Sequence, residues 1–212
     1  VELKALCGLA IAVGVSTPVL AQTTASPLKF YWAGQVARGS QANPTSEPIR
    51  STELSLRAGD RLQFYISPAN PCYVYFLHSG SNGELETLYP DGGATGKPLT
   101  GGSQKYFGWY ELDDTRGREM FFLVVSATAL TDLERMIEDH RRAGAADRAA
   151  AAARVIAEIG RLRAKYQKPE TTASRAPVIA GSMRAGTINL AAEAQEMKAD
   201  TLFALTYVLD HK

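Results

Sequence analysis

The sequence predicts a mainly β fold with one helical excursion: an antiparallel, β-sandwich-like domain, a C-terminal helical hairpin and a closing C-terminal strand. Three observations predict it. From residue 53 to 66 apolar residues recur at every second position, and 73–78 and 119–126 are short apolar runs, both of which are typical of strands. After Ser126 the apolar period lengthens to about 3.6 residues, which is typical of helices. Residues 201–209 are apolar on both faces, as a strand inside a sheet is.

Length and composition fit one folded domain. The chain has 212 residues, 45% of them hydrophobic and 21% charged, close to the globular average. Basic side chains number 23 and acidic ones 22, which leaves a net charge of +1. These values exclude a collagen, a disulfide-dense miniprotein and a wholly disordered chain, and they provide no global field that would hold nucleic acid.

The first 21 residues have the layout of a signal peptide. Residues 3–15 are almost wholly apolar but too few to span a bilayer, and the small residues Val19 and Ala21 follow at the positions that signal peptidase prefers. We expect cleavage after Ala21, export to the periplasm or the extracellular space, and a Ser/Thr-rich tether at 22–27. An apolar core helix is the alternative interpretation of this segment.

Period-two patterning predicts the β domain over residues 28–129. We expect strands at 28–36, 53–57, 61–66, 73–78, 85–89, 105–112 and 119–126. The turn at 58–60 predicts a β-meander, and Asn82-Gly83 predicts a tight hairpin. Residues 38–50 contain two prolines and no period, so we expect an exposed loop. Cys72, the one cysteine left after cleavage, lies in a strand-like run and is expected to be buried.

Several blocks of this region resemble domain-of-unknown-function family 4384. The blocks are 56–62, 72–77 followed by Gly83-Glu84 and 88–90, and 117–119 leading to 123–126. The resemblance covers roughly residues 53–133, and the order of the blocks carries it. It implies a compact β-sandwich-like module found in bacterial exported or envelope proteins, with no established catalytic residues. The helical stretch after Ser126 departs from the family.

Residues 130–168 are expected to form a helical hairpin that leaves the β domain and packs back on it. Asp132 is the predicted cap of a first helix, and a second helix is predicted over 145–166. The region 169–212 is expected to provide a linker and the closing strand. Within it we expect a linker at 169–177, a short strand at 186–190 and a helical turn at 191–199 before the strand at 201–209.

The patterns of catalytic and metal sites are missing from the sequence. The three histidines, His78, His140 and His211, have no metal-ligand spacing, and no Gly-x-Ser-x-Gly elbow is present. The glycine-rich segment 92–98 lacks the spacing of a phosphate loop. We therefore expect no catalytic residues, no metal and no cofactor.

Two groups of residues are candidates for binding. Aromatic side chains suit contact surfaces, and the candidates are those members of one group of strand residues that are exposed: Tyr65, Tyr75, Tyr106, Trp109 and Tyr110. Between residues 141 and 168 eight basic residues accompany two acidic ones. The basic candidates there are Arg154, Arg161 and Arg163. They could face an anionic membrane surface or an acidic partner, hold the helix against an acidic part of the β domain, or simply be solvated.

The leading hypothesis is a non-enzymatic exported envelope or secreted module that binds a protein or an envelope polymer, or serves as a scaffold for one, without nucleic acid. One alternative is a hydrolase with a dispersed carboxylate and histidine site, which a pocket uniting His78 with acidic side chains would favour. The other is a structural subunit of an envelope assembly.

Overall fold

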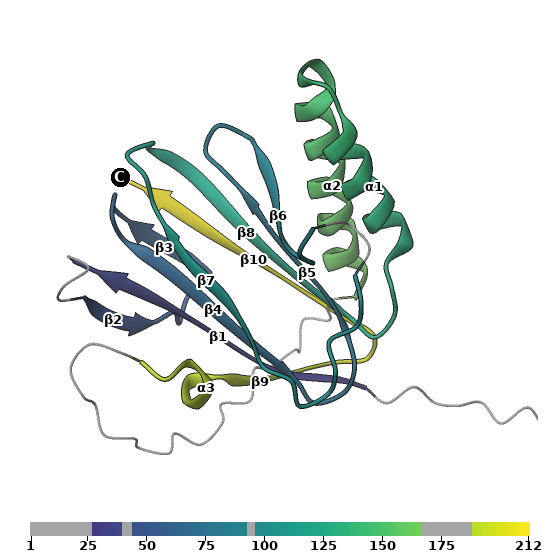
Figure 1. The fold of residues 1–212 in the computed structure, drawn as a ribbon, viewed down its shortest axis with the longest axis horizontal. Helices are drawn as coiled ribbons and strands as arrows, with labels where there is room; N and C mark the ends of the chain where they lie inside the picture. Colours follow the sequence, from purple (N-terminus) through teal and green to yellow (C-terminus); the bar gives the residue numbers. More distant parts are fainter. Residues whose placement is uncertain (1–26, 40–43, 93–95, 167–187) are drawn as a thin grey trace, which may run out of the picture.

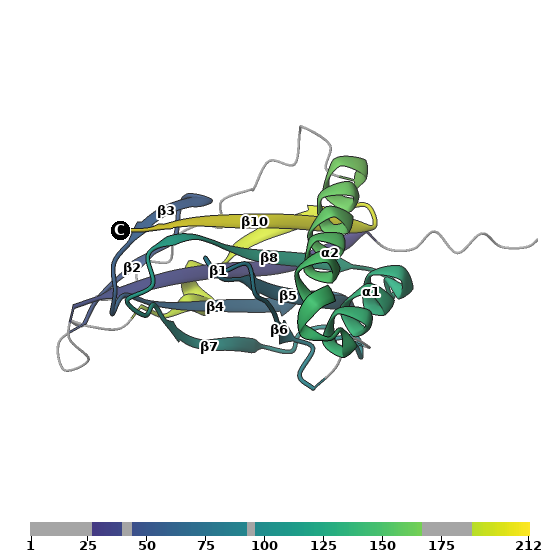
Figure 2. The ribbon, with the colours of Figure 1, turned by 90° about the horizontal axis from the view of Figure 1, so that it is seen from above.

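The computed structural model describes residues 27–39, 44–92, 96–166 and 188–212. Two five-stranded sheets face each other, and a pair of helices stands beside one of them (Figures 1 and 2). The predicted fold class, a β-sandwich-like domain with a helical hairpin and a closing strand, is confirmed. The predicted signal peptide, the tether up to residue 26 and the predicted linker at 169–177 lie outside the described residues. Within the described ranges, no helix is both long and apolar enough to cross a bilayer.

The first sheet, sheet A, is wholly antiparallel and has the order β2-β1-β4-β7, with β9 also paired to β1. Its strands are β1 (Leu28–Arg38), β2 (Thr45–Pro48), β4 (Arg61–Pro68), β7 (Lys105–Glu111) and β9 (Gln195–Ala199). The long strand β1 carries β4 along one edge and shares the other between β2 and β9.

Sheet A corrects three sequence-based expectations. The expected loop at 38–50 contains β2, and most of the expected helical turn at 191–199 is β9. Of the strand expected at 186–190, only residues 188–190 are described, and they form no strand: Leu190 begins α3 (Leu190–Glu193). This single helical turn is capped by the Asn189 side chain, which accepts two backbone N–H bonds. Short polar edge strands show no hydrophobic period, because their backbone bonds to β1 decide their conformation.

The second sheet, sheet B, has the order β3-β10-β8-β5-β6. Its strands are β3 (Glu53–Leu56), β10 (Leu202–His211), β8 (Gly117–Ser126), β5 (Tyr73–Ser79) and β6 (Leu85–Tyr89). The closing strand β10 lies between β3 and β8, as its two apolar faces predict. It runs parallel to β3, so the sheet is mixed.

The predicted meander at 53–66 is wrong, because β3 and β4 belong to different sheets. The turn between them carries the chain from sheet B to sheet A. Gly59 has a φ of 80° there, and the Asp60 carboxylate accepts the Arg57 N–H at 3.0 Å and an Arg38 N–H at 2.8 Å. Both sheets turn an apolar face to the same core, so hydrophobic alternation could not show that two successive strands part company.

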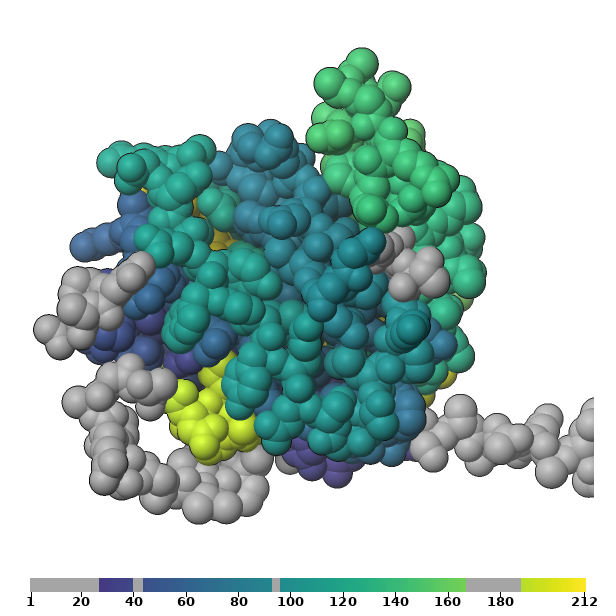
Figure 3. Space-filling view, in the orientation of Figure 1, coloured from purple at the N-terminus to yellow at the C-terminus, as the bar shows by residue number. Residues whose placement is uncertain are grey.

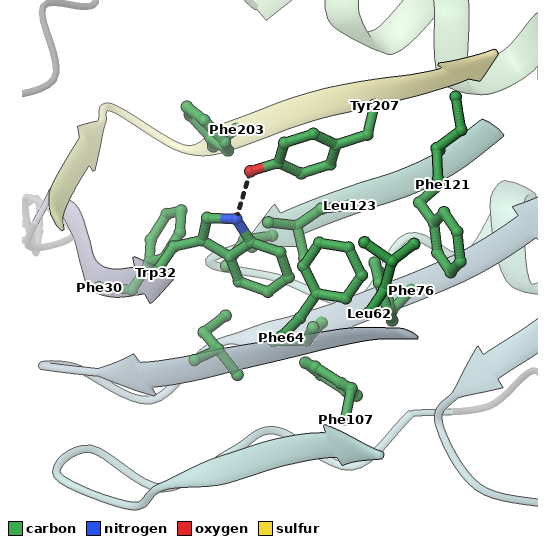
Figure 4. Packing of buried hydrophobic residues seen from close by; sticks show 14 of the residues in the cluster. Phe30, Trp32, Leu62, Phe64, Phe76, Phe107, Phe121, Leu123, Phe203 and Tyr207 are labelled. Carbon is green, nitrogen blue, oxygen red and sulfur yellow. Dashed lines mark hydrogen bonds between the residues drawn. The ribbon is translucent and has the colours of Figure 1, made fainter. Parts of the chain in front are cut away.

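The space between the sheets is filled mainly by aromatic rings, as Figure 4 shows. Phe64 and Phe76 are fully buried at its centre, with ring centroids 5.2 Å apart. Trp32 is also buried, and its indole N–H donates to the Tyr207 hydroxyl at 2.8 Å, which satisfies the polar atoms of both rings. Cys72 is buried as predicted, and burial raises the pKa of its thiol to about 12.

The helices α1 (Thr131–Arg142) and α2 (Ala145–Tyr166) pack over part of the outer face of sheet B. Their apolar stripes, which include Ile137 and Ile159, contact Tyr75 and its neighbours on β5, β8 and β10. Asp132 is not the cap of α1, because the helix starts after Leu130 without a side-chain cap. The sheet instead holds the residue before the helix: the Tyr75 hydroxyl accepts the Leu130 N–H at 2.9 Å.

Candidate functional site

A bulge in the edge strand β7 changes which side chains reach the surface of sheet A. Gly108 and Trp109 together oppose one residue of β4, Gln63. The extra residue reverses the alternation of the strand, so Trp109 turns outward while Phe107 before it and Tyr110 after it face the core. Strict alternation would have placed Trp109 and Phe107 on the same face. The surface position of Trp109 therefore depends on a feature that the sequence pattern does not show.

The outer surface beside this bulge, which we call the aromatic face, consists of Arg61, Tyr65, Tyr106 and Trp109. Tyr106 and Trp109 are 46% and 42% exposed, against full burial of most other large apolar side chains in the described residues. The Arg61 guanidinium lies 5.5 Å from the centre of the Trp109 ring, and the Tyr65 and Tyr106 ring centres are 4.9 Å apart. The cation and the rings support one another from two neighbouring strands.

Tyr65 forms the floor of the aromatic face and is itself buried, with 3% exposed. It packs with Ala33 against Leu190 and Ala194, which lie in and just after α3. The expectation that Tyr65 contacts a partner directly is therefore corrected: its side chain supports Tyr106 from below. Residues distant in the sequence meet here, because β9 and α3 return to the edge of β1.

Two other aromatic candidates point inward. Tyr75 lies on the outer face of sheet B, where the helices bury it fully. Its hydroxyl donates to the Glu134 carboxylate at 2.7 Å. Burial raises the pKa of Tyr75 above its ordinary value. Tyr110 is half-buried and packs edge-on to Phe76, and burial raises its pKa to about 12. Tyr75 is therefore excluded as a contact residue, and Tyr106 and Trp109 remain.

The three basic candidates are exposed on α2 but do not form one patch. Arg161 follows Arg154 by seven positions, about two helical turns, which puts both on one side of the helix, whereas Arg163 is turned by about 200° from Arg161. The Arg161 guanidinium makes two hydrogen bonds to the Glu158 carboxylate, at 2.7 and 2.6 Å, and this holds the pKa of Glu158 below its usual range. Part of the local positive charge is therefore already neutralised within the helix.

A cleft of about 430 Å³ lies at one end of sheet B, between the β5–β6 hairpin, the β7–β8 turn and the helical hairpin. Figure 3 shows the recess between the first two of these segments. The His78 ring nitrogen Nε2 lies 2.8 Å from Glu119 Oε2, and His211 Nδ1 lies 4.0 Å from the other oxygen of that carboxylate. The carboxylates that line the cleft are Glu84, Glu86, Glu111, Asp113 and Glu119.

From the sequence, a pocket uniting His78 with acidic side chains could be named only as what a hydrolase would require. Its position could not be predicted, because residues of β5, β6, β7, β8, α1 and α2 line the cleft. In the sequence, His78 has no metal-ligand spacing to the other histidines, and nothing there relates it to Glu119. No group of three metal-ligating side chains is found in the described parts of the chain. A histidine held by a carboxylate can act as a general base, and Ser81 lines the same cleft. No hydroxyl among the described residues is hydrogen-bonded to the His78 ring.

The central part of the chain matches a known protein family. Residues 55–129 match the family described as a domain of unknown function (DUF4384), which confirms the resemblance found in the sequence. The match runs from the end of β3 to just past β8 and leaves the helical hairpin, β9 and β10 outside it. No match is found among curated proteins, and none among solved structures.

Proposed function

We propose that the protein is an exported, non-catalytic module that binds a protein or an envelope polymer through the aromatic face of sheet A. The observation that carries this proposal is the β7 bulge, which turns Trp109 outward beside Tyr106. Leaving two large aromatic side chains in water forgoes the stability that burying them would give. Covered by a partner, the same rings would contribute much of the binding energy, as tryptophan and tyrosine do at protein interfaces.

The support beneath the aromatic face favours binding without a large ordering cost. Tyr65 is held under α3, and β9 is fixed to β1 by the Lys29–Glu196 ion pair at 2.9 Å as well as by backbone bonds. Arg61 lies beside Trp109. A surface whose side chains are already positioned loses little conformational entropy when a partner covers it.

Site-specific photocrosslinking in intact cells tests the proposal. A photoreactive phenylalanine analogue at position 109 is expected to give one dominant adduct, which Tyr106→Ala weakens. The same analogue at Glu53, exposed on β3 in the other sheet, is the matched control and should not give that adduct. Identical adduct patterns from the two positions, or recovery of nonspecific neighbours alone, would contradict a binding role for the aromatic face.

A second candidate function, hydrolysis, rests on the cleft that unites His78 with five carboxylates. The His78–Glu119 pair would supply the general base, and Ser81 or a water molecule the nucleophile. Turnover of ester, amide or glycosidic model substrates by the purified protein, abolished in His78→Ala, would establish this function. Full activity in His78→Ala would exclude His78 as its base.

A further inference from the structure

The aromatic face has a hollow between its two exposed rings. Gly108 is exposed and lies between Tyr106 and Trp109 on β7, where it adds no side chain. A Cβ atom built on Gly108 would meet no described atom within 4 Å. Phe107, the other residue between the two rings, faces the core. The rings of Tyr106 and Trp109 therefore flank an open space instead of forming one continuous apolar surface.

An amide group lies beside this hollow. Gln63 is the residue of β4 opposite the β7 bulge, and its neighbours Leu62 and Phe64 point into the core, so its side chain lies on the outer face. Its Oε1 atom accepts a hydrogen bond from Gln35 Nε2 at 2.9 Å, which fixes the direction of the amide. The Gln63 NH₂ group is not buried and has no acceptor among the described residues. It is therefore available to donate to a ligand that enters the hollow.

Each exposed ring is backed by protein on one side and is open to water elsewhere. The Arg61 guanidinium lies 5.5 Å from the centre of the Trp109 ring, and the Tyr65 ring centre lies 4.9 Å from that of Tyr106. The negative face of an aromatic ring attracts the C–H groups on the face of a sugar ring. The hydroxyl groups at the rim of the same sugar accept hydrogen bonds from amides. Two open rings with an amide donor beside the space between them match this combination of groups.

The small extent of the apolar surface favours a glycan over a folded protein as the ligand. Among the described residues, the exposed large apolar side chains are Tyr106, Trp109 and Tyr166, and the last of these lies on α2. A standard protein interface covers about 800 Å² on each partner and has an apolar core. Two rings without a large exposed aliphatic neighbour in the described part of sheet A provide little of such a core. A narrow chain of sugars needs no more than these rings and the polar groups around them.

We infer that the aromatic face binds a β-linked glycan of glucose-configured sugars, which rests on Trp109 and Tyr106 and accepts a hydrogen bond from Gln63 in the hollow. This inference rests on the proposed function and names its ligand. Equatorial substituents leave only C–H groups on the two faces of each sugar ring, which suits stacking on aromatic side chains. The β linkage keeps the glycan extended, as a surface along one strand requires. Chains with and without N-acetyl groups share this chemistry.

Isothermal titration of the purified protein with cellohexaose, and with its N-acetylated counterpart chitohexaose, tests this inference. We expect saturable binding of at least one of them. Tighter binding of chitohexaose would identify an N-acetylated glycan as the ligand, and tighter binding of cellohexaose a glycan without acetamido groups. Maltohexaose is the matched control, because it contains the same sugars as cellohexaose in a coiled, α-linked chain, and it should not bind measurably.

Two variants test whether the glycan lies on the aromatic face. Trp109→Ala should weaken binding about tenfold or more, as truncation of a central aromatic side chain does at other interfaces. Gly108→Leu should fill the hollow and also weaken binding. Its thermal transition should stay in place, because the new side chain enters open space. Tyr166→Ala, which removes the exposed ring on α2, is the control and should leave the affinity unchanged.

Absence of saturable binding of both cellohexaose and chitohexaose would overturn the inference. A dominant protein adduct from position 109 would in that case support the proposed function with a protein as the partner, whereas loss of both the glycan binding and the adduct would contradict the proposed function too. Equal affinity for maltohexaose, or unchanged affinity in Trp109→Ala and Gly108→Leu, would also overturn the inference.

Discussion

The outer faces of the two sheets carry similar aromatic side chains but meet different surroundings. On sheet B, Tyr75 is fully buried beneath the helical hairpin, and its hydroxyl donates to Glu134 of α1. On sheet A, α3 is only one turn long and covers Tyr65, which leaves Tyr106 and Trp109 at the surface. A tyrosine on a strand is thus part of the core or part of a contact surface according to which later segment returns to cover it.

The difference also separates the side chains that stabilise the fold from those that we propose for binding. The helical hairpin uses its apolar stripes to close the outer face of sheet B, and each side chain there removes apolar area from water. Trp109 contributes less hydrophobic stabilisation, because a large part of its surface stays in water. Substitutions in the two regions should therefore affect different measurements, and four predictions test this.

The largest loss of stability is expected for Ile159→Ala, at the buried face of α2. Ile159 is 1% exposed and packs in the cluster between the hairpin and sheet B. Removing its side chain should lower the free energy of unfolding by about 2–4 kcal/mol, measured by urea denaturation. Arg154→Ala, an exposed position of the same helix, is the control and should change it by less than about 0.5 kcal/mol. Equal effects would mean that the hairpin does not pack on the sheet.

A smaller loss is expected for Tyr75→Phe. The hydroxyl donates to the Glu134 carboxylate and accepts the Leu130 N–H, so its removal leaves both groups without this partner in a buried site. The free energy of unfolding should fall by about 1–2 kcal/mol. Tyr106→Phe, at the exposed tyrosine of sheet A, should be close to neutral. If Tyr106→Phe were the more damaging change, the assignment of the two tyrosines to core and surface would be reversed.

A further, modest effect concerns the pH dependence of the helical hairpin. The pKa of His140 is lowered in the folded protein, chiefly by burial and then by Arg148, whereas the unfolded chain has the ordinary value near 6.5. Protons therefore bind the unfolded chain more readily, and stability should decline as the pH falls from about 6.5 toward the lower folded pKa. His140→Phe should flatten that part of the curve of denaturation midpoint against pH. The same slope in both proteins would show that His140 does not contribute to it.

The smallest effect on stability is expected for Trp109→Ala. The side chain is 42% exposed and its main partner is Arg61. The thermal transition should barely move, whereas the adduct formed by the photoreactive analogue at position 106 of the same face should be lost. Trp32→Phe is the opposite case: it removes a buried hydrogen bond to Tyr207 and should lower stability while leaving the aromatic face intact.

Strong local periods allowed most of the fold to be predicted from the sequence. The hairpin at Asn82-Gly83, helix α2 and the buried closing strand β10 each have a pattern that one segment contains by itself. Strand partners were harder to predict, because alternation shows that β3 has an apolar face but not which sheet it joins. Short edge strands such as β2 and β9 form through backbone bonds to β1 and have no pattern of their own.

The candidate sites were predicted only in part. Aromatic content drew attention to β7, but the outward turn of Trp109 results from the bulge opposite Gln63. The cleft depends on contact between loops that are distant in the sequence, so His78 and Glu119 showed no relation before the fold was known. A site whose residues come from several loops can be recognised only when the topology is known, because residue types alone do not show which loops meet.

Hydroxyl-radical footprinting tests the central claim most directly. It compares the unmodified protein alone with the same protein in complex with the partner that crosslinking identifies. Tyrosine and tryptophan side chains react readily when exposed, so one experiment compares both regions. The account predicts that the partner lowers the oxidation of Tyr106 and Trp109 and leaves Tyr166, exposed on α2, unchanged. Protection of Tyr166 with no change at Tyr106 and Trp109 would contradict it and place the contact surface on the helical hairpin.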